Sequence, residues 1–220
     1  MREIKGVLFD CDGTLVDSQA SICAAMDAAF AALSLPPPDR HRTRRVVGLS
    51  LPQAMARMLP DGTPALHDAL ADAYKAAFQD LRAGGAVQEP LYDGIADLVT
   101  ALDDAGWMLG VATGKSDRGL AHCLAFHGLT DRFVTLQTAD RHPSKPDPSM
   151  AFQAMAEAGA IPETTVMIGD TSFDMELARA ANIRAIGVDW GYHDADELTA
   201  AGADVVVRNV ADLRALLLGD

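Results

Sequence analysis

The chain has 220 residues, 49% of them hydrophobic, which is enough for one large domain or for a core domain with an insertion. Its 18 basic and 31 acidic residues give a formal net charge of −13, which argues against binding to nucleic acid or to an anionic membrane surface. The positive charge that receives an anionic ligand must therefore be local.

The N-terminus and the cysteines predict a cytoplasmic protein. Residues 1–5 contain no apolar signal core, and no apolar run in the chain approaches the length of a membrane span. Cys11, Cys23 and Cys123 are odd in number and form no CxxC pair, which is typical of reduced thiols. Neither a disulfide framework nor a zinc site is predicted.

The first predicted strand covers residues 4–10 and ends at Asp10, with Asp12 two positions further on. A short apolar run that stops at turn residues is typical of a buried parallel strand, and ligands gather at the carboxyl ends of such strands. Two ionised carboxylates would repel each other in a dry crevice there. The alternative is a strand followed by an Asx-type turn, so the choice depends on the rest of the chain.

Residues 17–88 contain helical patterns only. Apolar residues recur at helical spacing over residues 18–33, 51–59 and 65–82, and no convincing strand separates these segments. We therefore predict an all-helical insertion of residues 17–88, which leaves and re-enters a core made of residues 1–16 and 89–220.

After the insertion, strands and helices alternate. The predicted strands are residues 107–113, 133–137, 166–170, 185–189 and 205–207, and the predicted helices are residues 95–105, 118–126, 149–158, 173–180 and 211–217. This order implies right-handed crossovers and a parallel sheet covered on both faces. The predicted fold class is α/β, a doubly wound, Rossmann-like parallel sheet with an inserted helical cap.

Two further segments at strand ends or in loops carry polar groups that suit an anion. Thr113 and Gly114 follow a predicted strand, where a hydroxyl and backbone N–H groups can hold an anion, although Thr113 or Ser116 could instead cap the next helix. Lys145 precedes Pro146 in a proline-rich loop, which is stiff and presents the amine in a fixed place.

Asp170 ends another predicted strand, and Asp174 has the helix capping-box spacing to Thr171. Each residue has a structural explanation when it is taken alone. Together with Asp10 and Asp12 they would converge at one edge of the sheet, where a hard dication such as Mg²⁺ offsets the charge of carboxylates. A metal beside an anion site of phosphate size predicts phosphoryl chemistry.

The segment from Asp10 to Ser18 resembles the first motif of the haloacid dehalogenase superfamily. Thr113, Lys145 and the run Gly169-Asp170 with Asp174 match its second, third and fourth motifs in order and spacing, so the resemblance spans the chain. Residues 143–146 and 187–192 are similar to the phosphoglycolate phosphatase-like branch. Related phosphatases often have asparagine at the position of Gly114, which weakens the inference to phosphoglycolate.

The resemblance implies a Mg²⁺-dependent phosphatase. Asp10 is then the nucleophile that forms an aspartyl-phosphate, and Asp12 protonates the leaving alcohol and later activates water. The implied metal ligands are Asp10, Asp170 and the backbone carbonyl of Asp12.

Further residues are implied to bind the transferring phosphate or to support its site. Thr113 and Lys145 hold the phosphate oxygens, together with the backbone N–H groups of Cys11 and Gly114. Asp174 orients Lys145 or a metal-bound water. The Cys11 thiol lies between two carboxylates, so we do not expect it to act as a nucleophile.

An aspartate at position 12 implies an alkoxide leaving group, because superfamily members that do not cleave phosphate esters usually lack it. The expected substrate is 2-phosphoglycolate or a similar small anionic phosphate monoester. A sugar phosphomutase uses the same pair of aspartates and is the main alternative. A non-catalytic binding protein is disfavoured because no catalytic position is lost.

The dense basic run at residues 40–45 is the concentrated positive charge of the insertion. We predict that one of Arg42, Arg44 and Arg45, with Arg45 as the first candidate, meets a second anionic group of the substrate. A solvated helix start is the alternative. The predicted assembly is a monomer or a homodimer.

Overall fold

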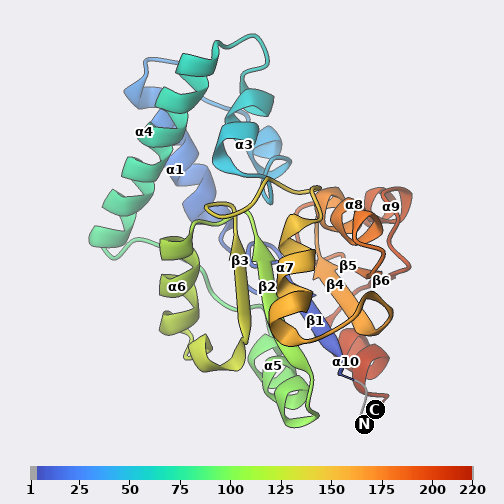
Figure 1. The fold of residues 1–220 in the computed structure, drawn as a ribbon. Coiled ribbons are helices and arrows are strands. Elements are labelled where there is room, and N and C mark those ends of the chain that lie inside the picture. The colour runs from blue at the N-terminus through green and yellow to red at the C-terminus, as the bar shows by residue number, and fades with distance from the viewer. Residues whose placement is uncertain (1–3, 220) are drawn as a thin grey trace.

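The computed structural model describes residues 4–219 and has the predicted α/β architecture (Figure 1). Six parallel strands form one sheet in the order β3-β2-β1-β4-β5-β6. This order reverses between β1 and β4, as in doubly wound sheets. The strands are β1 (Gly6–Phe9), β2 (Met108–Thr113), β3 (Thr135–Thr138), β4 (Thr165–Gly169), β5 (Arg184–Val188) and β6 (Val205–Val207). The prediction of a doubly wound parallel sheet is confirmed.

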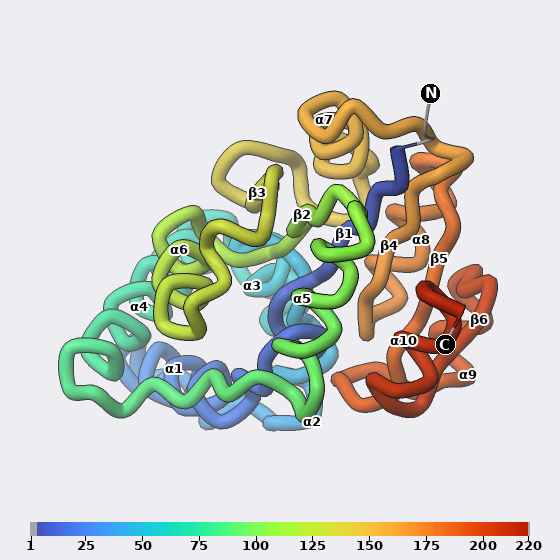
Figure 2. Tube along the Cα trace, turned by 90° about the horizontal axis from the view of Figure 1, so that it is seen from below, coloured from blue at the N-terminus to red at the C-terminus, as the bar shows by residue number. Residues whose placement is uncertain are grey.

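Each face of the sheet is covered by its own set of helices (Figure 2). Successive side chains of a strand point to opposite faces, so Val7 and Phe9 join one apolar cluster and Leu8 joins the other. The first cluster includes α5 (Ile95–Asp104), α6 (Asp117–Phe126) and α10 (Val210–Leu218), and the second includes α7 (Ser149–Ala158), α8 (Ser172–Ala180) and α9 (Ala195–Ala200). Burial on both faces explains why the strands are apolar runs without alternation.

The inserted segment forms a separate group of helices beyond the carboxyl ends of the strands (Figure 1). Met26, Phe30, Met55 and Leu70 belong to its apolar cluster, which also takes in Phe173 of α8 and so joins the insertion to the core. The helices are α1 (Gln19–Ala32), α2 (Arg40–Arg44), α3 (Leu51–Met58) and α4 (Pro64–Ala83).

The two connections of the insertion run side by side. Val16 forms an antiparallel bridge with Leu91, and the Asp17 N–H donates to the carbonyl oxygen of Pro90 at 2.8 Å. None of the helices in residues 4–219 has both the length and the apolar character needed to cross a membrane.

Two helices were not predicted from the sequence. The five-residue helix α2 lies in the basic run and begins where the Asp39 side chain accepts from His41 N–H. The six-residue helix α9 begins at a capping box between Asp194 and Glu197. Both are too short to show an apolar period, so capping residues are their main local signal. Two short 3₁₀ turns, at Thr130–Arg132 and Pro162–Thr164, complete the described elements.

Candidate active site

Asp10 lies directly beyond β1, at the point where the strand order reverses, and is fully buried. Its N–H donates to the carbonyl oxygen of Ile168 at 2.9 Å, so the ladder of the sheet fixes its backbone. Its Oδ1 accepts from Cys11 N–H at 2.6 Å and lies 3.1 Å from Lys145 Nζ. Its Oδ2 is buried and has no hydrogen-bond partner within residues 4–219. A buried carboxylate oxygen without a partner is costly, and a cation bound to it removes that cost.

Asp170 follows β4 at the same edge and is also fully buried. Its Oδ1 accepts from the Thr14 hydroxyl at 2.8 Å, and its Oδ2 accepts from Tyr192 N–H at 2.9 Å. Gly13 has φ 87° and passes so close that a Cβ there would lie 2.2 Å from Asp170 Oδ2. Only glycine fits this left-handed turn against the carboxylate, so the turn after β1 and the end of β4 form one unit.

Lys145 is a fully buried cation between two carboxylates. Its Nζ lies 2.5 Å from Asp174 Oδ1 and 3.1 Å from Asp10 Oδ1. Burial alone would lower the pKa of Lys145, but the charges of Asp10 and Asp174 raise it above its ordinary value, so the amine is protonated. Asp174 Oδ2 accepts from the N–H and the hydroxyl of Thr171 at 3.0 and 2.7 Å. Asp174 therefore both caps α8 and holds Lys145.

The loop that presents Lys145 leads directly into α7, which begins at Ser149 as predicted, with Pro148 just before it. Asp147 Oδ1 accepts from Ser149 N–H at 2.9 Å, which satisfies a free donor of the first turn. The Ser144 hydroxyl of this loop accepts from Ser50 N–H of the insertion at 2.8 Å.

The three buried carboxylates form a cluster that fits a divalent cation. One oxygen each of Asp10, Asp170 and Asp174 lies within 4.8 Å of the others. Burial raises the pKa of Asp10 to about 7, although Lys145 opposes this, and the Asp174 and Asp12 charges raise it further. Burial and the neighbouring Asp10 also raise the pKa of Asp170 well above its ordinary value. One lysine does not offset three carboxylates, whereas a hard dication with oxygen ligands does.

Asp12 has a different set of partners. Its Oδ1 accepts from the Ser18 hydroxyl at 2.5 Å and from Lys115 Nζ at 2.6 Å. Lys115 Nζ also lies 2.7 Å from Glu89 Oε1. The side chain of Asp12 is not part of the cluster of three carboxylates, and its contact to a metal through the backbone carbonyl stays a prediction.

A cavity of about 880 Å³ lies between the strand ends and the insertion, and Asp10, Asp12, Thr113 and Gly114 all line it. A Cβ on Gly114 would lie 2.6 Å from the carbonyl oxygen of Leu49 and 2.7 Å from that of Gly48. The loop before α3 therefore packs directly on Gly114. This contact gives a steric reason for a glycine where related phosphatases often have asparagine.

Cys11 presents its backbone and not its thiol to the site. Its side chain is buried in the core, with Sγ 3.9 Å from Cys123 Sγ. The contact with Cys123 and burial raise the pKa of the Cys11 thiol well above its ordinary value, so it is not a thiolate nucleophile. Its N–H is engaged by Asp10 Oδ1, and its contact to phosphate stays a prediction.

Arg45 does not lie where we expected a substrate contact. It is absent from the residues that line the cavity, and its guanidinium forms a two-point ion pair with Glu197 of α9. The ion pair joins the insertion to the core. This placement gives no support to the predicted role of Arg45 in substrate binding.

Several residues of the site were not predicted from the sequence. Lys115 stands two positions beyond Thr113 at a predicted strand end, so its place in the chain was a usable signal. Glu89 lies in a connection without periodicity and gave none. The backbone N–H of Tyr192 donates to Asp170, a contact that was not predicted from the sequence.

Comparison with known proteins identifies the family to which this chain is similar. The profile of the haloacid dehalogenase-like hydrolase family matches residues 7–188. A probable phosphatase, IndB, of Dickeya dadantii is 36% identical over 94% of this chain and 90% of its own length. A phosphoglycolate phosphatase of Pseudomonas putida is 31% identical over 97% of this chain and 78% of its own length.

Among solved structures, a predicted phosphatase from Clostridium acetobutylicum superposes with a TM-score of 0.88 at 27% identity, over 99% of this chain and 100% of its own. The chain belongs to the haloacid dehalogenase-like hydrolase family. The predictions of this superfamily and of a hydrolase related to phosphatases are confirmed.

Proposed function

We propose that the chain is a Mg²⁺-dependent phosphatase that hydrolyses small-molecule phosphate monoesters through an aspartyl-phosphate on Asp10. The observation that carries this proposal is the buried Asp10 carboxylate. One of its oxygens contacts Lys145, and the other has no hydrogen-bond partner in the described part of the chain. The carboxylate stands within ligand distance of Asp170 and Asp174, at the reversal of strand order where ligands bind.

The proposed reaction has two steps. The carboxylate of Asp10 attacks phosphorus, the bond to the leaving oxygen breaks, and Asp12 donates a proton to that oxygen. Asp12 then takes a proton from the water that releases phosphate from Asp10. Thr113 and Lys145 hold the transferring oxygens. Magnesium held by Asp10, Asp170 and the carbonyl of Asp12 would offset the negative charge of phosphate and carboxylates.

The test of this function is phosphate release from 4-nitrophenyl phosphate and 2-phosphoglycolate with and without Mg²⁺. We expect release that stops when the metal is chelated. A sugar phosphomutase would move phosphate between hydroxyls of a sugar phosphate with little net release. If the wild-type protein releases no phosphate from any ester in a broad panel, the proposal is wrong.

Magnesium should stabilise the protein more at high pH than at low pH. The pKa of Asp10 rises from 3.8 to about 7 on folding, so the native state binds more protons than the unfolded state between these values. Without metal, this group therefore lowers the free energy of unfolding as the pH rises through that window. Mg²⁺ competes with these protons, so we expect it to raise Tm by at least about 3 °C more at pH 8 than at pH 5.

The measurement is a set of thermal melts with Mg²⁺ or with a chelator at both pH values. The matched variant is Asp10→Asn, which cannot ionise at this position and should reduce the difference between the two pH values. An equal effect of Mg²⁺ at pH 5 and pH 8 in the wild type would contradict the proposed metal site.

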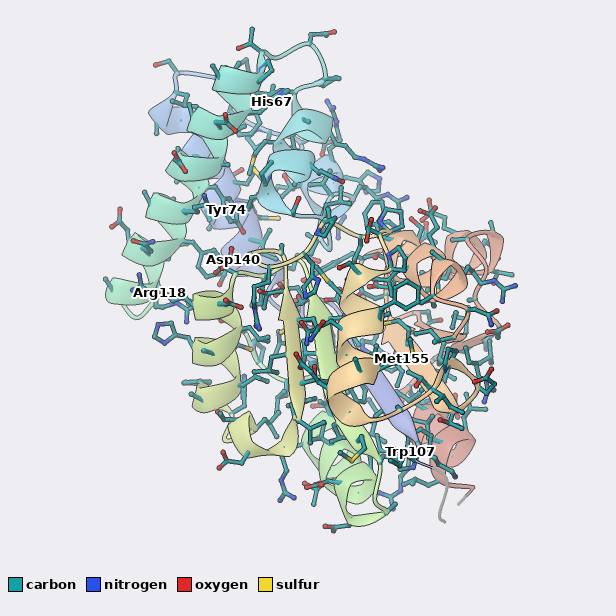
Figure 3. The ribbon with its side chains drawn as sticks, viewed as in Figure 1. His67, Tyr74, Trp107, Arg118, Asp140 and Met155 are labelled. Carbon is teal, nitrogen blue, oxygen red and sulfur yellow. The ribbon has the colours of Figure 1, made fainter. Side chains whose placement is uncertain are left out.

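The residues that line the cavity are the candidates for selecting the substrate. The lining includes Tyr74 and Phe78 of α4 in the insertion, and Arg118 and His122 of α6 in the core. Arg118 is exposed and has no hydrogen bond or ion pair among the described residues, and Figure 3 shows it at the start of α6, below α4. We infer that Arg118, in place of Arg45, receives the second anionic group of a substrate such as 2-phosphoglycolate.

Arg118→Ala should lower kcat/KM for 2-phosphoglycolate by about 10-fold, the scale of one charge-assisted hydrogen bond. Ethyl phosphate has the same two carbons without the carboxylate, so its kcat/KM should change little. Arg45→Ala is the matched variant and should leave the ratio of kcat/KM for 2-phosphoglycolate to kcat/KM for ethyl phosphate unchanged. A ratio that moves with Arg45→Ala and not with Arg118→Ala would restore the assignment made from the sequence.

We further propose that residues 17–88 act as a cap over a core of residues 1–16 and 89–220. The support is the separate apolar cluster of the insertion and the paired connections at Val16 and Leu91. A cytoplasmic location and a monomeric or homodimeric state stay predictions.

A further inference from the structure

Lys115 is a nearly buried cation to which the proposed reaction gives no role. Its side chain is 9% exposed, and its Nζ lies 2.6 Å from Asp12 Oδ1 and 2.7 Å from Glu89 Oε1. A cation is costly to bury unless its charge and its hydrogen bonds are satisfied, and here two carboxylates satisfy both. The site therefore holds the amine of Lys115 in one place.

Both donors to Asp12 reach the same oxygen. Lys115 Nζ and the Ser18 hydroxyl contact Oδ1, whereas Oδ2 has no hydrogen-bond partner among the described residues. Asp12 lines the cavity, and Oδ2 is not among the buried oxygens without a partner, so it is open to a ligand. The carboxylate is thus held by one oxygen and is free to exchange a proton through the other.

Glu89 ties this arrangement to the insertion. It lies between the end of α4 and Leu91, in the connection that returns to the core. Its Oε2 lies 3.4 Å from the guanidinium of Arg82 in the last turn of α4, and its carbonyl oxygen lies 2.7 Å from His127 Nε2 of the core. Glu89 is therefore held both by the insertion, through Arg82, and by the core, through His127, and Lys115 connects it to Asp12.

We propose that Lys115 and Glu89 form a positioning pair for Asp12. Lys115 holds Oδ1 so that Oδ2 faces the leaving oxygen, and Glu89 holds Lys115 while the insertion is seated on the core. This inference rests on the proposed phosphatase function. The bond from Asp10 to phosphorus forms as the bond to the leaving oxygen breaks, and the proton passes from Asp12 Oδ2 to that oxygen. Lys115 neither gains nor loses a proton.

The test compares two substrates of similar size whose leaving groups differ in their need for a proton. 4-Nitrophenolate leaves readily without protonation, whereas the alkoxide of benzyl phosphate needs a general acid. Lys115→Met should lower kcat/KM for benzyl phosphate by about 100-fold and for 4-nitrophenyl phosphate by less than about 5-fold. kcat/KM includes only the steps up to and including the departure of the alcohol. The later release of phosphate from Asp10 therefore does not affect the ratio of kcat/KM between the two substrates.

Glu89→Gln keeps an acceptor and removes the charge. We therefore expect it to change the ratio of kcat/KM between benzyl phosphate and 4-nitrophenyl phosphate in the same direction, but by less. If Lys115→Met does not fold, as judged by circular dichroism, Glu89→Gln decides the question alone. Lys5→Met and Glu176→Gln are the matched controls, because both residues are exposed and lie outside the cavity lining. They should leave both kcat/KM values unchanged.

Asp12→Asn removes the general acid itself, so its selective loss of kcat/KM for benzyl phosphate is the reference for the Lys115 and Glu89 variants. Equal losses on both substrates in the Lys115 and Glu89 variants, with a selective loss in Asp12→Asn, would overturn the positioning pair and leave the phosphatase function intact. Absence of phosphate release by the wild type from both esters would instead remove the proposed function on which the pair depends.

Discussion

Asp10→Asn is expected to abolish Mg²⁺-dependent phosphate release, with kcat lower by at least about 10⁴-fold, the scale seen when a nucleophile is removed. An amide is a poor nucleophile and carries no charge for a metal. The variant should fold, because asparagine keeps the shape of a side chain whose charged form is already disfavoured by burial, which raises its pKa to about 7. Phosphate release and thermal melts at pH 8 measure both effects.

The control for this variant is Asp189→Asn. Asp189 follows β5 as Asp10 follows β1, but it is exposed and does not line the cavity. Its replacement should leave kcat and Tm unchanged. If Asp10→Asn retained most of the wild-type activity, Asp10 would not be the nucleophile.

Lys145→Met is expected to lower the free energy of unfolding by about 3 kcal/mol at pH 8 without metal, because it leaves buried carboxylates uncompensated. The methionine has similar length and fills the space, so the loss reports the missing charge. Asp10 and Asp174 carry that charge when they are ionised. Denaturant unfolding measures the change.

The effect of this variant should depend on pH. The pKa of Asp10 is about 7 in the native protein and higher still when the charge of Lys145 is removed. This carboxyl is therefore protonated at pH 5, and the loss of stability caused by Lys145→Met should be smaller there. Lys5→Met is the control, because Lys5 is exposed and lies only over the ring of Trp107, so we expect a loss of at most about 1 kcal/mol that is the same at both pH values. A Lys145→Met protein as stable as the wild type at pH 8 without metal would show that the buried pair contributes nothing.

The sequence allowed the sheet and the strand ends of the site to be predicted, because both depend on local patterns. Apolar runs that stop at Asp10, Thr113 and Asp170 mark strands that end at one edge, and parallel topology brings those ends together. The capping box of Asp174 was also readable from spacing, and the structure shows that the same carboxylate serves Lys145.

The contacts between the insertion and the core could not be predicted in this way. The ion pair of Arg45 with Glu197 joins residues 152 positions apart, and no local pattern links them. The same holds for Glu89 and Lys115, which meet only because the returning connection runs beside the end of β2. A basic run in an acidic chain predicts a substrate site, but in the structure part of this run holds the insertion on the core.

The most direct test of the account is to look for the covalent intermediate on Asp10. The protein is mixed with a phosphate ester and Mg²⁺, quenched in acid during turnover, digested, and analysed by mass spectrometry. We predict one phosphoryl group on the peptide that contains Asp10, absent from the Asp10→Asn protein and from samples without Mg²⁺. Turnover without any phosphoryl group on Asp10, or with the group on another residue, would contradict the account.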